Sequence, residues 1–439
     1  MPRNARLFVA FRVLFNARFY YPVLAVLFVD LGLTLDQYAL LNVAWALSIV
    51  LFELPLGALG DRIGRRPLVV AAAAIMVVEM SVLAFAPLSN PALLFPLFLA
   101  NRVLSGLAEA AASGADEALA YDSLVDEGRS AEWPNVLAVL GRAMSVAFVL
   151  SMVVGGAVYD RGLMQGAADR LNLAVTLTQQ ETARFPVYLT LGLAVGALLA
   201  SLAMREPKPA GATGGASLAS TAGAIGQAGR WILGARFPLA LMLLNLVVDS
   251  GVRVFLTLTS TYYRMIGIPA GLFGVLGAAF AMLGFFVPSL ARRMALARTP
   301  LANFTAVVAI VLAGVTGVAV VQRWWSVVFV AFLGVGFYML GFFVSHYLNA
   351  ATESSRRATV LSFKSLANNI AYGGAGWAFA LLMRALAGGA KPAPGSEAED
   401  LVFARALLAL PSGLFALGVP LLLWSARLPR MRRVAGTES

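Results

Sequence analysis

The sequence has no cysteine, only one histidine, and few charged residues for its length of 439. The absence of cysteine excludes disulfides and thiolate metal sites, and His346 alone cannot build a histidine metal centre, so we expect no metal and no cofactor. Charged residues make up 13% of the chain, where about a quarter is usual for a soluble domain. Most of the surface is therefore expected to face hydrocarbon rather than water.

Apolar residues make up 60% of the chain and occur in runs of about 20, long enough to cross a bilayer core of roughly 30 Å. These runs predict an all-α membrane protein with twelve transmembrane helices. We place the helices near 7–31, 37–59, 67–87, 92–120, 135–158, 185–204, 238–262, 270–291, 301–321, 324–349, 359–386 and 401–425. The polar segments 159–184 and 387–400 are expected to be loops.

The net charge of +11 comes from arginines that cluster between apolar runs, as in the cytoplasmic loops of membrane proteins. We therefore expect no nucleic-acid binding, and we expect both termini to be cytoplasmic. Three lysines against thirty arginines, with abundant alanine and glycine, suggest a GC-rich bacterial genome. A bacterial cytoplasmic (inner) membrane is thus the expected location, with the first apolar run as an uncleaved helix.

The chain is interrupted once, by a stretch rich in Pro, Gly, Ala, Ser and Thr. This stretch reads as a flexible cytoplasmic linker, in which 227–237 could form a short interfacial helix. We therefore predict an N-terminal six-helix bundle at 1–204, a linker at 205–236, and a C-terminal six-helix bundle with a basic tail at 237–439. Two such bundles around a midplane site are typical of secondary transporters.

The loop after the second predicted helix reads GALGDRIGRRP over residues 57–67. It resembles the signature G-x-L-[AG]-D-R-x-G-R-[RK] of the major facilitator superfamily, in the loop where that family carries it. Gly57 and Gly64 allow close helix approach and a tight turn. The resemblance implies that Asp61 accepts hydrogen bonds at the N-terminus of the eleventh helix, and so latches the two halves together in one state.

The same loop supplies the residues of a predicted inner gate. Asp122 is expected to pair with one of the basic residues of the signature, and Glu53 is expected to join the same network. The basic residues are Arg62, Arg65 and Arg66.

Two further stretches bear on the resemblance. Arg102-Val103-Leu104-Ser105-Gly106 is similar to the family's R-x-x-[QS]-G on the fourth helix. The antiporter pattern G-x-x-x-G-P-x-x-G-G matches 147–156 only at its end, because Ser151-Met152 replaces the Gly-Pro. This departure weakens the case for a drug/proton antiporter and leaves the superfamily resemblance unchanged.

Charged residues inside a spanning helix are costly and by default mark a pathway or a coupling site. Arg102, Glu109 and Asp116 are spaced by seven, which would place them on one face of a continuous helix. Glu109 and Asp116 are expected to take up and release protons, because partial burial favours the protonated form of a carboxylate. Arg102 would tune them. A permanent pairing within the N-terminal half is the alternative.

Other polar residues inside the predicted helices are candidates for the cavity. On the first helix, Arg12 and Asp30 are expected to snorkel at the interfaces, whereas Arg18 needs a carboxylate or an anionic ligand. Asp249 and Arg253, one helical turn apart, could pair for packing or open to bind substrate. The remaining cavity candidates are Asn16, Tyr21, Asn245, His346, Lys364 and Asn368.

The resemblance implies a secondary transporter that works by alternating access, with proton-coupled export of a small organic or amphipathic molecule. Proton-coupled uptake and lipid transport are the alternatives within the same fold. An integral-membrane enzyme is disfavoured, because the sequence has no H-E-x-x-H motif and no repeated Asp cluster for a Mg-diphosphate. Expected partners are the substrate, protons and the bilayer, and we expect a monomer.

Overall fold

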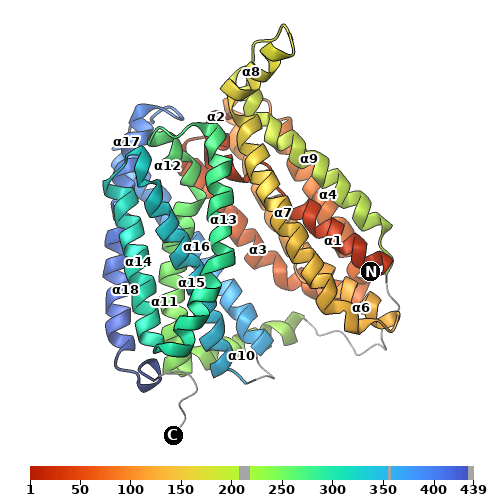
Figure 1. Cartoon of the computed structure of the whole chain (residues 1–439), viewed down its shortest axis with the longest axis vertical. Coiled ribbons are helices and arrows are strands. Elements are labelled where there is room, and N and C mark those ends of the chain that lie inside the picture. Colours follow the sequence, from red (N-terminus) through yellow and green to blue (C-terminus); the bar gives the residue numbers. More distant parts are fainter. Residues whose placement is uncertain (207–217, 354–356, 434–439) are drawn as a thin grey trace. The chain divides into compact units, whose positions relative to one another are not determined.

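The structure is a computed structural model that describes residues 1–206, 218–353 and 357–433 (Figure 1). Throughout the described residues the regular structure is helical, without any strand. Eleven of the described helical segments are long and apolar enough to cross a membrane. A twelfth helix, α16 (Arg357–Leu386), has 30 residues but is not among them, and it carries Lys364, Asn368 and Asn369 in its first half. The predicted all-α membrane fold is confirmed.

The chain forms two compact units, and each takes a short segment from a helix that otherwise belongs to the other unit. Unit 1 consists of Met1–Leu33, Leu41–Thr221 and Pro269–Ala278. Unit 2 consists of Thr34–Leu40, Ala222–Ile268 and Ala279–Ser439. The first turn of α3 (Leu35–Ile63) therefore groups with unit 2, and the first turns of α13 (Ala270–Ala297) group with unit 1.

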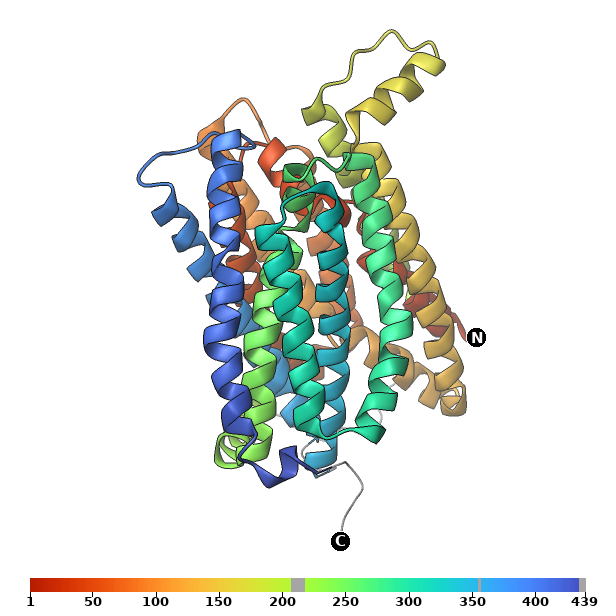
Figure 2. The same ribbon diagram turned by 60° about the vertical axis from the view of Figure 1, so that its left-hand side comes forward.

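The remaining helices of unit 1 follow in chain order. They are α1 (Arg3–Asn16), η1 (Tyr21–Val23), α2 (Leu24–Asp30), α4 (Arg65–Ala84), α5 (Pro91–Ala112), α6 (Ala115–Asp126), η2 (Ser130–Glu132), α7 (Trp133–Tyr159), α8 (Arg161–Arg170) and α9 (Gln179–Ala203). In both views α8 projects beyond the ends of α7 and α9 (Figures 1 and 2).

The helices of unit 2 begin with α10, which lies in the region where the sequence predicts a linker and whose residues up to Thr221 still group with unit 1. They are α10 (Leu218–Gly234), α11 (Arg236–Thr257), α12 (Thr259–Met265), α14 (Pro300–Val320), η3 (Trp324–Ser326), α15 (Val327–Ala351), α16, α17 (Glu397–Leu407), α18 (Ala409–Ser425) and η5 (Pro429–Met431). In Figure 2, α17 and α18 form a nearly continuous blue rod. Residues 207–217 of the predicted linker lie outside the described part of the chain, and the predicted domain boundaries stay a prediction.

The expectation of one continuous helix over 92–120 is wrong. The helix ends at Ala112, Ser113 has a ψ of 110°, and Gly114 takes a φ of +74° before α6 begins. Glycine populates this left-handed conformation without the steric cost that a Cβ imposes. Glu109 and Asp116 therefore lie on two different helices, and a single stripe of Arg102, Glu109 and Asp116 does not exist.

Other helix boundaries also differ from the expected ones. The first predicted helix breaks after Asn16, and Arg18 lies in the irregular segment before η1. The segments 159–184 and 387–400, expected as loops, contain α8 and the starts of α9 and α17. Thr178 and Ser396 cap α9 and α17, each by accepting a hydrogen bond from the backbone N–H of the helix's third residue.

Two glycines at the end of α7 allow unusually close packing within unit 1. A Cβ on Gly155 would lie 1.7 Å from the carbonyl oxygen of Phe19, and one on Gly156 would lie 2.8 Å from the backbone nitrogen of Gly274. Only glycine permits backbones to approach this closely. The glycine pair that closes the partial antiporter pattern therefore has a packing role in this structure.

Candidate functional site

The centre of the polar site in unit 1 is a buried ion pair between Arg18 and Glu79. The Arg18 guanidinium Nη1 lies 2.9 Å from the Glu79 carboxylate, and the two side chains are 3% and 0% exposed. Arg18 also donates to the hydroxyl of Tyr20 at 2.8 Å and to that of Ser105 at 3.3 Å. The break after α1 frees Arg18 from the helix and lets it reach α4 and α5 together.

The neighbours of this pair hold it in place. The amide of Asn101 donates to the backbone carbonyl of Glu79 at 2.7 Å, which ties α5 to α4. The guanidinium of Arg18 also lies 5.7 Å from the ring centre of Phe15, within range of a cation–π contact. Arg18, which the sequence leaves without a partner, thus has a carboxylate on α4 and a set of neutral donors and acceptors.

A second buried cation, Arg102, has neutral direct contacts and lies within electrostatic range of Glu79. It donates to the amide oxygen of Asn42 at 3.0 Å and lies over the ring of Trp45 at 5.5 Å. Its Nε has no hydrogen-bond partner among the described residues. Gly106, one turn further along α5, packs directly on the backbone carbonyl of Trp45, where a Cβ would lie 2.7 Å away.

Asp116 forms the second ion pair of unit 1. Its fully buried carboxylate lies 2.8 Å from the Arg12 Nε, and Glu117 lies 3.8 Å from the same guanidinium. α6 thus brings a carboxylate to Arg12, and the position of Arg12 at an interface stays a prediction. Asn16 donates to the carbonyl of Arg12, in its own helix, at 2.8 Å.

Glu109 and Tyr21 lie near the first ion pair without joining it directly. Glu109 is half-buried and within electrostatic range of both Arg18 and Tyr21. Tyr21 is 38% exposed and packs edge-to-face on Tyr20. These two residues thus lie between the closed Arg18–Glu79 pair and more accessible surface.

Asp30, also expected to snorkel, is hydrogen-bonded within unit 1. Its carboxylate accepts from the hydroxyl of Tyr159 and from the amide of Gln179 at 3.1 Å. These bonds join the end of α2 to the end of α7 and the start of α9. The position of Asp30 at an interface stays a prediction.

The described residues of the loop signature are held by hydrogen bonds to the end of α9 and to the residues that follow it. Gly64 has a φ of +95° and precedes α4, whose first two N–H groups, of Arg65 and Arg66, donate to the carboxylate of Glu206 at 2.9 and 2.7 Å. The guanidinium of Arg66 donates to the carbonyls of Met204 and Leu202, near the end of α9. These hydrogen bonds tie the start of α4 to the end of α9 and to the residues that follow it, and the dipole of α4 favours the negative charge of Glu206 at its N-terminus.

Arg65 and Asp122 form the ion pair expected at the predicted inner gate, at 2.6 Å. Its opening and closing stay a prediction. Glu53 is hydrogen-bonded to the side chain of Ser113, at the break between α5 and α6. Gly57 lies in α3, with room for a Cβ. The side chains of Asp61 and Arg62 lie outside the described part of the structure, so the latch stays a prediction.

Unit 2 has its own polar cluster between α11 and α16. The amide of Asn245 donates to that of Asn368 at 2.6 Å. Asp249 and Arg253 lie 3.5 Å apart, and the Arg253 guanidinium sits 4.5 Å from the ring centre of Tyr372. Lys364 lies within electrostatic range of Asp249. The cluster thus contains two cations and one carboxylate, on facing helices that carry the predicted residues.

His346 lies apart from this cluster, on α15. Its ring stacks on Phe342 with a centroid distance of 6.0 Å and meets Tyr347 edge-on at 5.0 Å. The side chains of Asn303 and Tyr347 are hydrogen-bonded at 2.7 Å, so α14 supports this aromatic group. A role in proton handling stays a prediction for His346.

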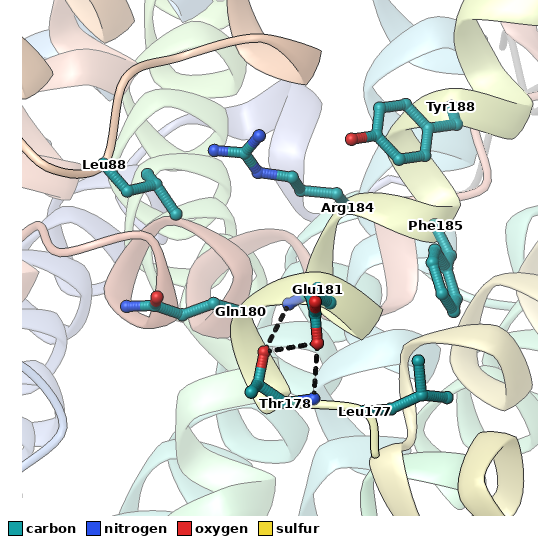
Figure 3. Close-up of a pocket in the computed structure, with 8 residues that line it drawn as sticks. All are labelled: Leu88, Leu177, Thr178, Gln180, Glu181, Arg184, Phe185 and Tyr188. Atoms are coloured by element: carbon teal, nitrogen blue, oxygen red, sulfur yellow. Dashed lines mark hydrogen bonds between the residues drawn. The ribbon is translucent and has the colours of Figure 1, made fainter. Parts of the chain in front are cut away.

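A pocket of about 440 Å³ lies elsewhere in unit 1, at the start of α9 (Figure 3). Thr178 and Glu181 face each other there in a reciprocal cap of α9. Arg184 donates to the carbonyl of Ala86 at 2.7 Å. The pocket contains none of the intramembrane charged residues described above. It is lined by Leu88, Leu177, Thr178, Gln180, Glu181, Arg184, Phe185 and Tyr188.

Three residues of these networks were not predicted to take part in them. Glu79 and Tyr20 are not among the predicted cavity residues, and Glu206 falls within the predicted linker. An unpaired Arg18 inside a span was the one signal that could have pointed to Glu79, because a buried arginine needs a carboxylate or an anion. Among the described residues no group of three or more His, Asp and Glu side chains could hold a metal ion.

Comparison with known families and structures places these features in a wider context. The family model described as Major Facilitator Superfamily matches residues 7–376. A search of curated proteins found no match. Solved structures share the fold. One is a bacterial homologue of the human lysosomal transporter Spinster, in an inward-facing and unoccupied conformation, with a TM-score of 0.71 and 15% identity over 99% of this chain and 100% of that one.

Two other similar structures are transporters for different compounds. The nucleoside transporter NupG has a TM-score of 0.69 and 12% identity, covering 95% of this chain and 99% of its own. A D-xylose-proton symporter has a TM-score of 0.62 and 12% identity, covering 100% and 99%. At such low identities these likenesses show the shared fold.

Proposed function

Because the chain belongs to the major facilitator superfamily and has a transporter fold, we propose that it is a proton-coupled secondary transporter working by alternating access. The proposed activity is export of a small organic or amphipathic molecule from a bacterial cytoplasm across the inner membrane. The observation that carries proton coupling is two ion pairs in unit 1: Arg18–Glu79, in which both side chains are buried, and Arg12–Asp116, in which the carboxylate is buried and the guanidinium is partly exposed.

A proton can act on such a pair in a defined way. Protonation of Glu79 removes its negative charge and leaves the buried Arg18 guanidinium without its ion-pair partner in a poorly solvated environment. Protonation of Asp116 likewise weakens the hold on Arg12, which keeps Glu117 nearby. Losing one partner of a buried pair costs about 3–5 kcal/mol, enough to favour a rearranged state of the helices that hold it. The two pairs involve α1, α4 and α6, so a proton on either carboxylate would be felt by several spans.

The cluster of unit 2 supports a proposal for the substrate. Arg253 and Lys364 face a single carboxylate, Asp249, so the cluster carries an excess positive charge in a mostly apolar bundle. An acidic group on the substrate would balance this charge, and Tyr372 and Asn368 offer aromatic and polar contact beside it. We therefore propose that the substrate carries an anionic group.

The test follows proton movement, so that the substrate need not be known beforehand. Purified protein is reconstituted in liposomes that contain a pH-sensitive dye, and matched anionic, neutral and cationic amphiphiles of equal chain length are added in turn. A proton flux with anionic compounds that Glu79→Gln abolishes supports the proposal. A compound that crosses with no proton movement, and equally well in Glu79→Gln, contradicts proton coupling.

Uptake by proton symport is the second candidate, favoured by the structural likeness to a D-xylose-proton symporter and by the absent Gly-Pro at Ser151-Met152. The direction of the proton flux separates the two, because export by exchange moves protons against the substrate and symport moves them with it. The proposed cytoplasmic position of both termini is tested separately, with reporter fusions at Met1 and Ser439. Size-exclusion chromatography with light scattering tests the proposed monomer.

A further inference from the structure

Two long helices, α3 and α13, each begin at a carboxylate supplied from far away in the sequence. The backbone N–H of Leu35 donates to Glu399 Oε1 at 2.7 Å, across 364 residues. The backbone N–H of Gly271 donates to Asp160 Oδ2 at 2.8 Å, across 111 residues. Both amides belong to the first turn of their helix, where the backbone N–H groups have no partner inside the helix.

The two carboxylates are bound in the same way. Each uses its second oxygen on a nearby amide: Glu399 Oε2 accepts from Gly395 at 2.8 Å, and Asp160 Oδ1 accepts from Leu163 at 3.0 Å. Asp160 is the N-cap of the short helix α8, and Glu399 lies in the first turn of the short helix α17. Each acid therefore joins the start of a short helix to the start of a long one.

The chemistry of both contacts favours the charged carboxylate. A helix N-terminus carries a partial positive charge, so an anion placed there is stabilised by the dipole as well as by the hydrogen bond. Glu399 is only 1% exposed, and such a buried carboxylate is tolerated because backbone amides satisfy both of its oxygens.

Both contacts involve helix ends that group with a different unit from the rest of the helix. Leu35 belongs to Thr34–Leu40, which groups with unit 2 although α3 continues into unit 1. Gly271 belongs to Pro269–Ala278, which groups with unit 1 although α13 continues into unit 2. Each carboxylate thus binds the end of a helix within its own unit, while the rest of that helix belongs to the other unit.

Further contacts hold the same two segments. Within unit 2, Arg384 donates to Asp36 at 2.7 Å, and the hydroxyl of Tyr38 donates to the carbonyl of Thr257 at 3.0 Å. Within unit 1, Gly156 packs on Gly274 so closely that neither position has room for a Cβ. These contacts are neutral or partly exposed, whereas Glu399 supplies a buried charge and Asp160 a partly buried one.

We propose that Glu399 and Asp160 are paired clamps of the transport cycle: they hold the exchanged ends of α3 and α13 in this conformation and release them when the two units move. They are positioning residues and touch no substrate. The inference goes beyond the proposed function, on which it rests only for the existence of a cycle.

Spectroscopy without substrate tests the clamps, and the absence of native cysteine allows site-specific spin labels. Ser89, in the loop between α4 and α5 of unit 1, and Lys391, in the loop before α17 of unit 2, are both exposed. Distances between labels at S89C and K391C are measured by double electron–electron resonance in nanodiscs. We expect Glu399→Gln and Asp160→Asn each to change the ratio of the conformational populations roughly tenfold, with a larger change in the double variant.

The controls are Glu397→Gln and Asp169→Asn, exposed acids in the same two short helices, which should leave the distance distribution unchanged. The proposal would be overturned if variants of Glu399 and Asp160 fold and melt at a lower temperature but keep the wild-type distance distribution. The two carboxylates would then be ordinary helix caps that stabilise the fold only. If Glu399→Gln does not fold, Asp160→Asn decides alone. Because neither substrate nor protons enter the measurement, a failure of the proton-coupled function leaves its outcome unaffected.

Discussion

Arg18 and Glu79 form an ion pair at 2.9 Å across 61 residues, with both side chains almost fully buried. Two apolar side chains of similar volume could fill the same space, and a buried ion pair adds little stability over such an apolar pair. Breaking it by removing one charge is nevertheless costly. The pair is therefore the first place to look for coupling between protonation and conformation.

The first prediction concerns Glu79→Gln. Removing this negative charge leaves Arg18 buried without a counter-ion, so we expect a loss of about 3 kcal/mol in the free energy of unfolding and a proton flux at least tenfold lower. Melting curves in detergent and the dye assay measure the two effects. The control is Glu117→Gln, because the Glu117 side chain is half exposed and lies further from its cation. Equal effects of both substitutions would remove Glu79 from coupling.

The second prediction concerns Asp116→Asn and Glu109→Gln. Each should flatten the dependence of transport on an imposed pH gradient, while exchange of substrate across equal pH continues. Asp116→Asn should have the larger effect, because Asp116 forms an ion pair with Arg12, whereas Glu109 interacts with Arg18 only at longer range. Full pH dependence in both variants would exclude α5 and α6 from coupling.

The third prediction concerns the glycines of α7. Gly155→Ala would place a Cβ 1.7 Å from the carbonyl oxygen of Phe19, so α7 and the segment between α1 and η1 must separate, at a cost of about 2–3 kcal/mol. Gly141→Ala in the same helix has open space around it and should be neutral or stabilising, by up to about 1 kcal/mol. Thermal unfolding compares the two. Equal melting temperatures would show that α7 can shift without cost.

The fourth prediction comes from the loop signature. Asp61→Asn should reduce transport at least tenfold while membrane insertion and melting temperature stay unchanged, because a latch acts between states of the cycle. Glu206→Gln is the contrasting variant. It weakens the cap of α4 and should lower the melting temperature. Wild-type transport rates in Asp61→Asn proteoliposomes would rule out the latch.

The apolar runs predicted the helical membrane fold well, because hydrocarbon selects long apolar segments almost independently of tertiary contacts. The breaks were harder to predict. Gly114 lies in a run that would continue as a helix, and a single internal glycine does not reveal that it will adopt a left-handed conformation. The stripe of Arg102, Glu109 and Asp116 was wrong for that reason.

Partners of the charged residues were the least predictable feature. Arg65 and Asp122, 57 residues apart, were expected to pair because both lie towards the cytoplasmic ends of predicted helices. No such signal joined Arg18 to Glu79 or Leu35 to Glu399. Helical periodicity gives the face of one helix and carries no information on which helix lies opposite. The cluster of Asn245, Asp249 and Arg253 was found because its members follow one face of α11.

The projecting helix α8 has a practical consequence for imaging. The side chain of Gln165 bonds to Asp169, to the carbonyl of Val175 and to the N–H of Leu177, so the loop that follows α8 is fastened to it. A 46.2 kDa chain so largely embedded in a detergent micelle offers few fixed landmarks for particle alignment. An antibody fragment raised against Arg161–Arg170 would supply one, without covering the ion pairs whose rearrangement is to be seen.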